Sequence, residues 1–198
     1  DSGGLPDLDR LTPQLLERTA LFYLCSPANP QGSVAGMAYL TRLIKLARAH
    51  DFVLAMDECY SEIYSAAPPP GALQACAEMA VAGAGDPFAN VLVFHSLSKR
   101  SNLPGLRSGF VAGDAEIIAR FRNFRAYVGP TTPLPVDAVA TRAWSDEAHV
   151  EQNRKLYAQK FDAADEILNG RFDYARPAGG FFLWLDTGDG EAAARELW

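Results

Sequence analysis

The feature that most constrains the fold is a series of short apolar runs, each followed by polar residues that can do chemistry. The runs predicted to form strands are residues 21–25, 52–56, 91–95 and 108–112. Nearly continuous apolar runs are typical of strands that are buried on both faces of a sheet. Helical periodicity separates the runs, and this alternation predicts an α/β fold with a mostly parallel sheet sandwiched by helices.

Helices are expected between and after these strands. The predicted helical segments are residues 34–50, 72–80, 114–127, 136–144 and 147–168, with another near 196–198. Ser33 and Asp114 are predicted to cap two of them, because their side-chain oxygens can accept free N–H groups of a first helical turn. Two further short strands, at 172–174 and 181–185, predict a smaller α+β unit. We therefore expect a large domain over residues 1–145 and a small domain over 146–198.

Composition and charge exclude several classes of function. With 198 residues, 48% of them hydrophobic, the chain can bury one large core or two small ones. A net charge of −6 without a Lys/Arg cluster predicts no nucleic-acid partner. No apolar run approaches the ~20 residues that span a bilayer, and residues 1–6 lack the features of a signal peptide. We therefore expect no membrane partner and a cytoplasmic location.

The three cysteines predict neither a disulfide framework nor a metal site. Cys25, Cys59 and Cys76 are an odd number and show no CxxC spacing. Reduced and partly buried thiols are the ordinary state of such residues in a cytosolic protein.

The segment from Ser96 to Arg107 carries the most informative chemistry. Lys99 follows a predicted strand, with the hydroxyls of Ser96 and Ser98 before it and Arg107 eight positions after it. A lysine amine can form an imine with an aldehyde, and hydroxyls with a guanidinium can hold a phosphate. Pyridoxal phosphate (PLP) carries both groups, so this segment predicts a PLP-dependent enzyme.

Two other polar residues follow predicted strands in the same way. Asn29 comes after the first strand and Asp57 directly after the second. Ligands of parallel α/β sheets gather at the carboxyl ends of the strands. We therefore expect Asn29, Asp57 and Lys99 to converge on one edge of the sheet.

The ordered motifs of the chain resemble those of the fold-type-I PLP-dependent aminotransferases of the class I/II group. The matching segments are 26–32 (SPANPQG), 57–60 (DECY), 96–99 (SLSK) and 107–109 (RSG), and the resemblance continues through 179–184 (GGFFLW). Within the group, segments 59–64, 69–75 and 94–102 most resemble bacterial N-succinyldiaminopimelate aminotransferases.

The resemblance implies a role for each matched residue around the reacting end of PLP. Lys99 would bond to the cofactor aldehyde and move protons on the substrate. Asp57 would keep the pyridine nitrogen protonated, and Tyr60 would hydrogen-bond the phenolic oxygen. Asn29 would share that oxygen and also contact the substrate α-carboxylate.

The resemblance also implies which residues would bind the phosphate of PLP. Ser96 and Arg107 match the family's phosphate ligands, and Ser98 adds another hydroxyl. Arginine suits this task because its planar fork gives two charge-assisted hydrogen bonds. The peptide bond between Asn29 and Pro30 is expected to be cis, since such bonds favour X-Pro in tight functional turns.

Simpler roles are open for these residues and their neighbours. Lys99 and Arg107 could be solvated surface residues, Asp57 a turn or helix cap, and Tyr60 an ordinary half-buried aromatic. His95, inside the third predicted strand, is expected to be a satisfied core histidine. Solvated or structural roles are expected for the nearby polar residues Glu58, Glu62, Tyr64 and Arg100.

The resemblance implies transamination between L-glutamate and an oxo acid, with N-succinyl-2-amino-6-oxopimelate of lysine and diaminopimelate biosynthesis as the expected acceptor. Alternatives are another class I/II aminotransferase, acting on aspartate-like, aromatic or acetylated substrates, or a non-catalytic PLP-binding regulatory domain. A homodimer with small-molecule substrates is implied. The chain looks like a fragment, because the family's N-terminal phosphate cradle and stacking aromatic residue and its C-terminal carboxylate-binding arginine have no match in it.

Overall fold

A computed structural model describes residues 4–81, 83, 85–129 and 132–197 of the chain. Parts of two sequence predictions lie outside the described residues. These are the absence of a signal peptide, which involves Asp1–Gly3, and the last predicted helix, which involves Trp198.

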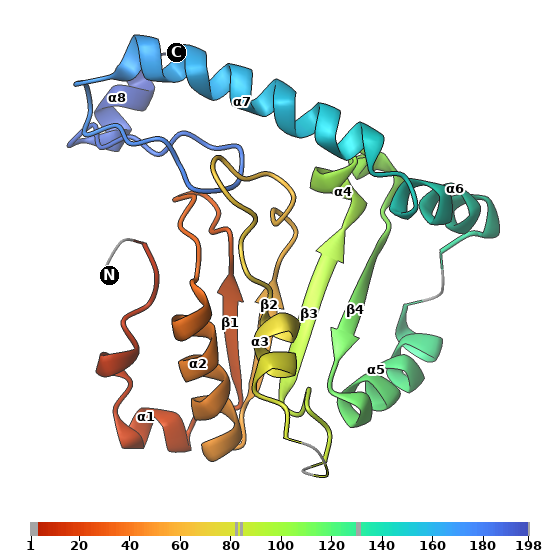
Figure 1. The fold of residues 1–198 in the computed structure, drawn as a ribbon. Helices are drawn as coiled ribbons and strands as arrows, with labels where there is room; N and C mark the ends of the chain where they lie inside the picture. The colour runs from red at the N-terminus through yellow and green to blue at the C-terminus, as the bar shows by residue number, and fades with distance from the viewer. Residues whose placement is uncertain (1–3, 82, 84, 130–131, 198) are drawn as a thin grey trace.

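A four-stranded sheet whose strand order follows the chain order forms the centre of the structure (Figure 1). Its strands are β1 (Leu21–Cys25), β2 (Val53–Asp57), β3 (Val91–Ser96) and β4 (Gly109–Gly113). The first three strands run parallel, and β4 runs antiparallel to β3. The predicted mostly parallel sheet is therefore confirmed, and each strand begins and ends within one residue of its expected place.

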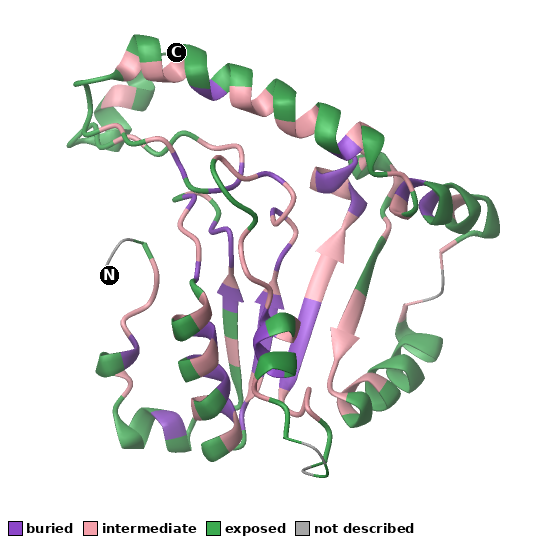
Figure 2. Ribbon diagram, in the orientation of Figure 1, coloured by how far each residue is buried: buried purple, intermediate pink, exposed green. Residues whose placement is uncertain are grey.

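Helices α2 (Met37–Ala49) and α3 (Ala72–Glu78) pack against one face of this sheet and form the main core with it (Figure 2). The buried residues of α2 recur at helical spacing: they are Leu40, Leu43, Ile44 and Ala47. This spacing places them on one stripe of the helix, which faces the sheet. They meet the buried strand residues Leu24, Leu54, Met56, Val91 and Val93.

The remaining helical elements surround this core. They are η1 (Leu8–Arg10), α1 (Pro13–Glu17), α4 (Leu97–Arg100), η2 (Pro104–Leu106), α5 (Ala115–Val128), α6 (Leu134–Trp144), α7 (Ala148–Leu168) and α8 (Gly190–Glu196). The predicted cap of α5 is confirmed, because Asp114 Oδ1 accepts a hydrogen bond of 2.9 Å from the backbone N–H of Ile117. The long α7 crosses above the carboxyl ends of the parallel strands (Figure 1).

Helix α2 begins later than the sequence predicts, and Ser33 does not cap it. The residue before its first turn is Gly36, which makes no side-chain cap. The backbone ahead of it is held in a loop instead: Ala28 N–H donates to the carbonyl of Ser33 at 2.8 Å, and Ala35 N–H donates to Ser26 Oγ at 2.9 Å. These bonds commit the chain to a turn where helical periodicity alone would continue the helix.

The prediction of two strands at 172–174 and 181–185 is wrong. Phe172 and Asp173 have φ values of 55° and 48°, which place them in a turn that Tyr174 N–H closes onto the carbonyl of Arg171. Residues 181–185 find no partner strand among the described residues. The side chains of Phe181 and Phe182 pack against other rings instead, so the apolar pattern that suggested a strand serves a different contact.

Two further expectations concern the chain as a whole. None of the helices in the described part of the chain combines the length and hydrophobicity needed to cross a membrane. The predicted domain boundary at residue 145 falls between α6 and α7, and it stays a prediction.

The core predicts a contrast between two leucines of neighbouring strands. Leu54 in β2 is fully buried, so Leu54→Ala should lower the free energy of unfolding by about 2–5 kcal/mol, because it leaves a cavity. Leu21 in β1 is 58% exposed, so Leu21→Ala should cost less than about 1 kcal/mol. Urea unfolding followed by circular dichroism measures both. Equal losses would contradict the packing described above.

Candidate functional site

The candidate site lies at the carboxyl ends of the three parallel strands, where β1 and β2 end level with each other and β3 runs two residues further. Cys25 at the end of β1 is paired with Asp57 at the end of β2, and Asp57 is paired with Phe94 in β3. Asn29 follows β1 in the next loop, and Lys99 lies in the single turn of α4 that follows β3. The structure therefore places Asn29, Asp57 and Lys99 at one edge of the sheet, as expected.

The Lys99 amine lies among aromatic rings. Its Nζ is 5.8 Å from the ring centroid of Tyr60 and 5.4 Å from that of Phe181. Its backbone carbonyl accepts a hydrogen bond of 3.3 Å from Asn153 Nδ2 of α7. Lys99 is partly buried, so it is not the fully solvated lysine of the simpler explanation.

Tyr60 and Asn29 form a polar pair beside this amine. Tyr60 is 6% exposed, and its hydroxyl accepts a hydrogen bond of 3.1 Å from Asn29 Nδ2. Burial raises the pKa of Tyr60, so its phenol keeps its proton at neutral pH. The hydroxyl accepts from Asn29 and can still donate its own proton to a ligand oxygen.

Asp57 accepts a hydrogen bond at each of its carboxylate oxygens. The hydroxyl of Tyr23 donates to Oδ2 at 2.6 Å, and the backbone N–H of Cys59 donates to Oδ1 at 3.1 Å. The sequence analysis missed Tyr23. The signal that could have found it is its position two residues before the end of β1, which places it on the same sheet face as Asp57.

The predicted phosphate ligands are only partly assembled. Ser96 Oγ lies 2.8 Å from Ser98 Oγ and accepts the N–H of Ser98 at the start of α4. Arg107 is exposed, and its Nη1 donates to the carbonyl of Pro104 at 3.0 Å. In the described part of the chain no hydrogen bond joins the Arg107 guanidinium to either serine. The two hydroxyls are thus brought together, whereas the guanidinium is bound to its own loop.

An aromatic wall from the C-terminal part of the chain completes this side of the site. Tyr157 of α7 stacks on Phe181, with ring centroids 5.4 Å apart and planes 11° apart. Phe181 and Phe182 meet the Tyr60 ring edge-on, at 5.4 and 5.8 Å. The sequence analysis quoted 179–184 only as a resemblance and gave Phe181 no role.

Two glycines allow this wall to approach the site closely. Gly179 N–H donates to the carbonyl of Gly32 at 3.1 Å, and Gly180 N–H donates to the carbonyl of Ile63 at 2.8 Å. A Cβ atom on Gly179 would lie 2.5 Å from Cγ of Pro27, which no side chain tolerates. The segment therefore docks on the loop after β1 because it carries glycine at this position.

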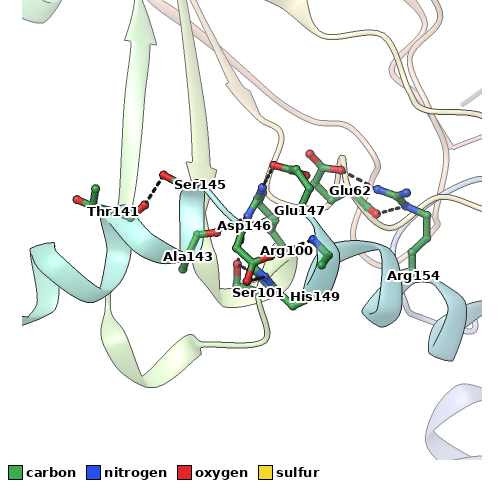
Figure 3. A network of polar contacts seen from close by, with 11 residues as sticks. Glu62, Arg100, Ser101, Thr141, Ala143, Ser145, Asp146, Glu147, His149 and Arg154 are labelled. Carbon is green, nitrogen blue, oxygen red and sulfur yellow. Dashed lines mark hydrogen bonds and ion pairs between the residues drawn. The ribbon is translucent and has the colours of Figure 1, made fainter.

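Helix α7 is tied to the site from above by Arg154. Its Nε donates to the carbonyl of Glu62 and its Nη2 to Glu62 Oε2, both at 2.9 Å (Figure 3). Its guanidinium also lies 4.2 Å from the ring centroid of Tyr64. Glu62 and Tyr64 thus have the structural roles that the sequence left open for them.

Arg100 makes the second tie, beside Lys99. It is buried, ion-paired with Glu147, and donates to the carbonyl of Ala143 at 2.9 Å (Figure 3). Its guanidinium also lies over the ring of Trp144. A buried guanidinium needs such partners, because an unpaired buried charge is strongly destabilising. Its role is structural, and it joins α4 to α6 and α7.

His95 and the buried Glu58 form a polar pair behind the site. His95 Nε2 lies 3.3 Å from Glu58 Oε2, and Glu58 Oε1 accepts the N–H of Ala72 at 2.7 Å. The ring of His95 also packs on Phe110, with centroids 5.1 Å apart. The expected satisfied histidine is confirmed, although its side chain is half-buried rather than enclosed.

The thiols near the site are free and unreactive in character. Burial raises the pKa of Cys25 to about 11 and, with the hydrogen bond and charge of Asp57, that of Cys59 to about 12. Cys76 is buried in the core, and burial raises its pKa as well.

The peptide bond between Asn29 and Pro30 is cis, as predicted, and so is the bond between Ser26 and Pro27.

The residues at this edge fit PLP. They supply an amine, a carboxylate held at both oxygens, a phenol paired with an amide, and two adjacent hydroxyls. These groups correspond to the aldehyde, ring nitrogen, phenolic oxygen and phosphate of that cofactor. Each lies at the ends of the three parallel strands, where ligands of such sheets bind.

Comparison with known proteins agrees with this chemistry. The family described as aminotransferase class I and II matches residues 2–198. A probable aminotransferase of Mycobacterium tuberculosis is 37% identical over 91% of this chain and 42% of its own length. The crystal structure of an aminotransferase from Neisseria meningitidis superposes with a TM-score of 0.88 at 43% identity, over 98% of this chain and 49% of that chain.

A further solved structure has a similar fold. A probable N-succinyldiaminopimelate aminotransferase from Thermus thermophilus superposes with a TM-score of 0.83 at 26% identity, over 96% of this chain and 50% of that chain. The chain thus spans about half the length of the relatives that it matches.

The raised thiol pKa values predict slow alkylation of Cys25 and Cys59. The thiolate is the reacting form, and at pH 8 pKa values of about 11 and 12 leave little of it. Iodoacetamide labelling, read by mass spectrometry, should be at least about a hundredfold slower than in urea-unfolded protein. Because folding favours the protonated thiols, the free energy of unfolding should also fall as pH rises above the ordinary thiol pKa. Labelling of Cys25 or Cys59 at the unfolded rate would contradict this.

Proposed function

This chain belongs to the class I and II aminotransferase family, and from that membership we propose that it carries the PLP-binding centre of an aminotransferase. The family is PLP-dependent. The observation that carries the proposal is the Lys99 amine beside Tyr60, at the sheet edge where Asp57 ends β2. A lysine in such a place is chemically able to hold an aldehyde and to act as a base.

In this proposal Lys99 is the catalytic base. PLP, when bound, supplies a protonated ring that stabilises negative charge at the substrate α-carbon. Lys99 would hold the cofactor aldehyde through its amine, and the same amine would move the proton at the substrate α-carbon. This task needs an amine that is close to the cofactor and held in place, and Nζ lies 5.8 and 5.4 Å from the ring centroids of Tyr60 and Phe181.

The other residues bind and orient the cofactor. Asp57 would hold the ring nitrogen, and the paired Tyr60 and Asn29 would hold the phenolic oxygen. Asn29 is exposed at the site and can also reach the substrate carboxylate.

The phosphate would be bound by Ser96, Ser98 and Arg107. The paired serine hydroxyls at the start of α4 support this assignment. Arg107 would take part by exchanging its bond to the Pro104 carbonyl for the phosphate, an exchange favoured by the greater strength of a charge-assisted hydrogen bond.

We propose glutamate as the amino donor and N-succinyl-2-amino-6-oxopimelate, an intermediate of lysine and diaminopimelate biosynthesis, as the acceptor. Two observations support this choice. The segments 59–64, 69–75 and 94–102 resemble those of N-succinyldiaminopimelate aminotransferases. The Thermus thermophilus structure described as a probable member of that group has the same fold over 96% of this chain.

We also propose a cytoplasmic homodimer. Substrates of this kind are small and water-soluble, which suits an enzyme of the cytoplasm. On α5, Phe124 and Tyr127 are 59% and 91% exposed, and exposed aromatic residues of this kind are typical of surfaces that bind another protein.

Replacement of Lys99 tests the proposed chemistry. In the protein expressed from the complete reading frame that contains this chain, Lys99→Ala should lower the rate of transamination by at least about 100- to 10,000-fold, because the base is lost. Lys45→Ala, which changes an exposed lysine of α2, is the matched control and should leave the rate unchanged. Release of 2-oxoglutarate from glutamate measures both. Sustained multiple turnover by Lys99→Ala would refute the assignment.

A panel of oxo acids tests the substrate. With glutamate as donor, kcat/KM should be at least about tenfold higher for N-succinyl-2-amino-6-oxopimelate than for oxaloacetate, phenylpyruvate or the N-acetyl analogue, which is the scale of discrimination that a shaped pocket provides. Preference for one of the others would make the protein a different aminotransferase. PLP binding without turnover of any pair would instead indicate a regulatory domain.

A further inference from the structure

We propose that Tyr23 is a positioning residue that holds the Asp57 carboxylate in the orientation required by the ring nitrogen of PLP. The inference rests on the proposed function and adds to the site a residue that no sequence motif identified. It follows from the geometry of the first two strands.

The register of β1 and β2 places Tyr23 within reach of Asp57. Tyr23 is paired with Ala55, and Cys25 is paired with Asp57 two residues further along. Residues two apart on a strand share a sheet face, and a diagonal neighbour is within reach of an aromatic side chain. The Tyr23 hydroxyl accordingly lies 2.6 Å from Asp57 Oδ2.

The Tyr23 hydroxyl and the Cys59 N–H together fix the carboxylate. The N–H of Cys59 binds Oδ1 at 3.1 Å, so each oxygen accepts a hydrogen bond, one from a residue of β1 and one from the loop after β2. Rotation of the carboxylate would break both bonds. Each oxygen keeps further lone-pair capacity, so one of them can still accept the N–H of a pyridinium ring.

The exposure of Tyr23 separates this role from core packing. The side chain is 59% exposed and lies on the sheet face opposite the main core. Burial of the hydroxyl and its bond to the Asp57 carboxylate raise the pKa of Tyr23 well above its usual range, so the phenol remains a donor at working pH. The ring contributes little to the core, whereas its hydroxyl makes the contact with Asp57.

The test compares PLP with an analogue whose ring nitrogen is replaced by C–H. In apo-protein from the complete reading frame, Tyr23→Phe should weaken PLP binding roughly five- to tenfold, the scale of one typical hydrogen bond. Affinity for the analogue should not change, because the analogue has no ring N–H that could donate a hydrogen bond to Asp57. Equilibrium dialysis measures both affinities without any need for turnover.

Matched variants exclude a general effect on folding. Tyr39→Phe removes a partly buried tyrosine hydroxyl bond away from the site, to the carbonyl of Pro6 at 2.8 Å, and should change neither affinity. Tyr23→Leu, which removes the ring as well, should weaken PLP as Tyr23→Phe does. In an Asp57→Ala background, Tyr23→Phe should have no further effect on PLP binding, because the two residues act through one contact.

Each outcome decides the matter. Unchanged PLP affinity in Tyr23→Phe, or an equal loss for PLP and the analogue, overturns the positioning role while leaving the proposed function intact. An additive loss in the Asp57→Ala background overturns it as well. Failure of the wild-type protein to bind PLP overturns the proposed function itself, so the two failures are distinguishable.

Discussion

The parallel register of β1, β2 and β3 is the constraint on which the rest of the structure depends. It sets Cys25 beside Asp57 and Asp57 beside Phe94, so that the loops that follow the strands start from one edge of the sheet. A slip of one residue would turn every side chain of a strand to the other face. Asp57 would then leave the face of Tyr23, and the core residues Leu54 and Met56 would face away from α2. The same pairing therefore secures both the core and the site.

The site also needs residues from far along the chain. Strand ends alone would leave the Lys99 amine open to water. Asn153 and Arg154 tie α7 to the carbonyl of Lys99 and to Glu62, and Phe181 brings an aromatic ring to the amine. Close approach at Gly32 and Gly179 makes that contact sterically feasible. The surroundings of Lys99 thus depend on tertiary contacts, although Lys99 itself lies in a local sequence motif.

The difference between local features and features that depend on tertiary contacts explains what the sequence could predict. The strands, and the placing of Asn29, Asp57 and Lys99 at one edge, follow from local patterns: continuous apolar runs, turn residues, and the rule that parallel strands share a carboxyl edge. The prediction of where α2 starts was wrong because hydrogen bonds within the preceding loop compete with helix formation, and the spacing of apolar residues gives no sign of such bonds. The prediction of strands at 172–174 and 181–185 was wrong because an apolar aromatic run can form a strand or pack into a cluster of rings. Which of the two forms depends on the residues that it meets from elsewhere in the chain. Tyr23 was missed because its significance depends on register.

The two tyrosines at this edge show how environment assigns different tasks to one chemical group. Tyr60 is buried and accepts a hydrogen bond from a neutral amide, so its own proton is free for a ligand oxygen. Tyr23 is largely exposed, and its proton is committed to the Asp57 carboxylate. Burial raises the pKa of both, so neither works as a base near neutral pH. One phenol can therefore act on a ligand directly and the other only through Asp57, and exchanging their environments would abolish both roles.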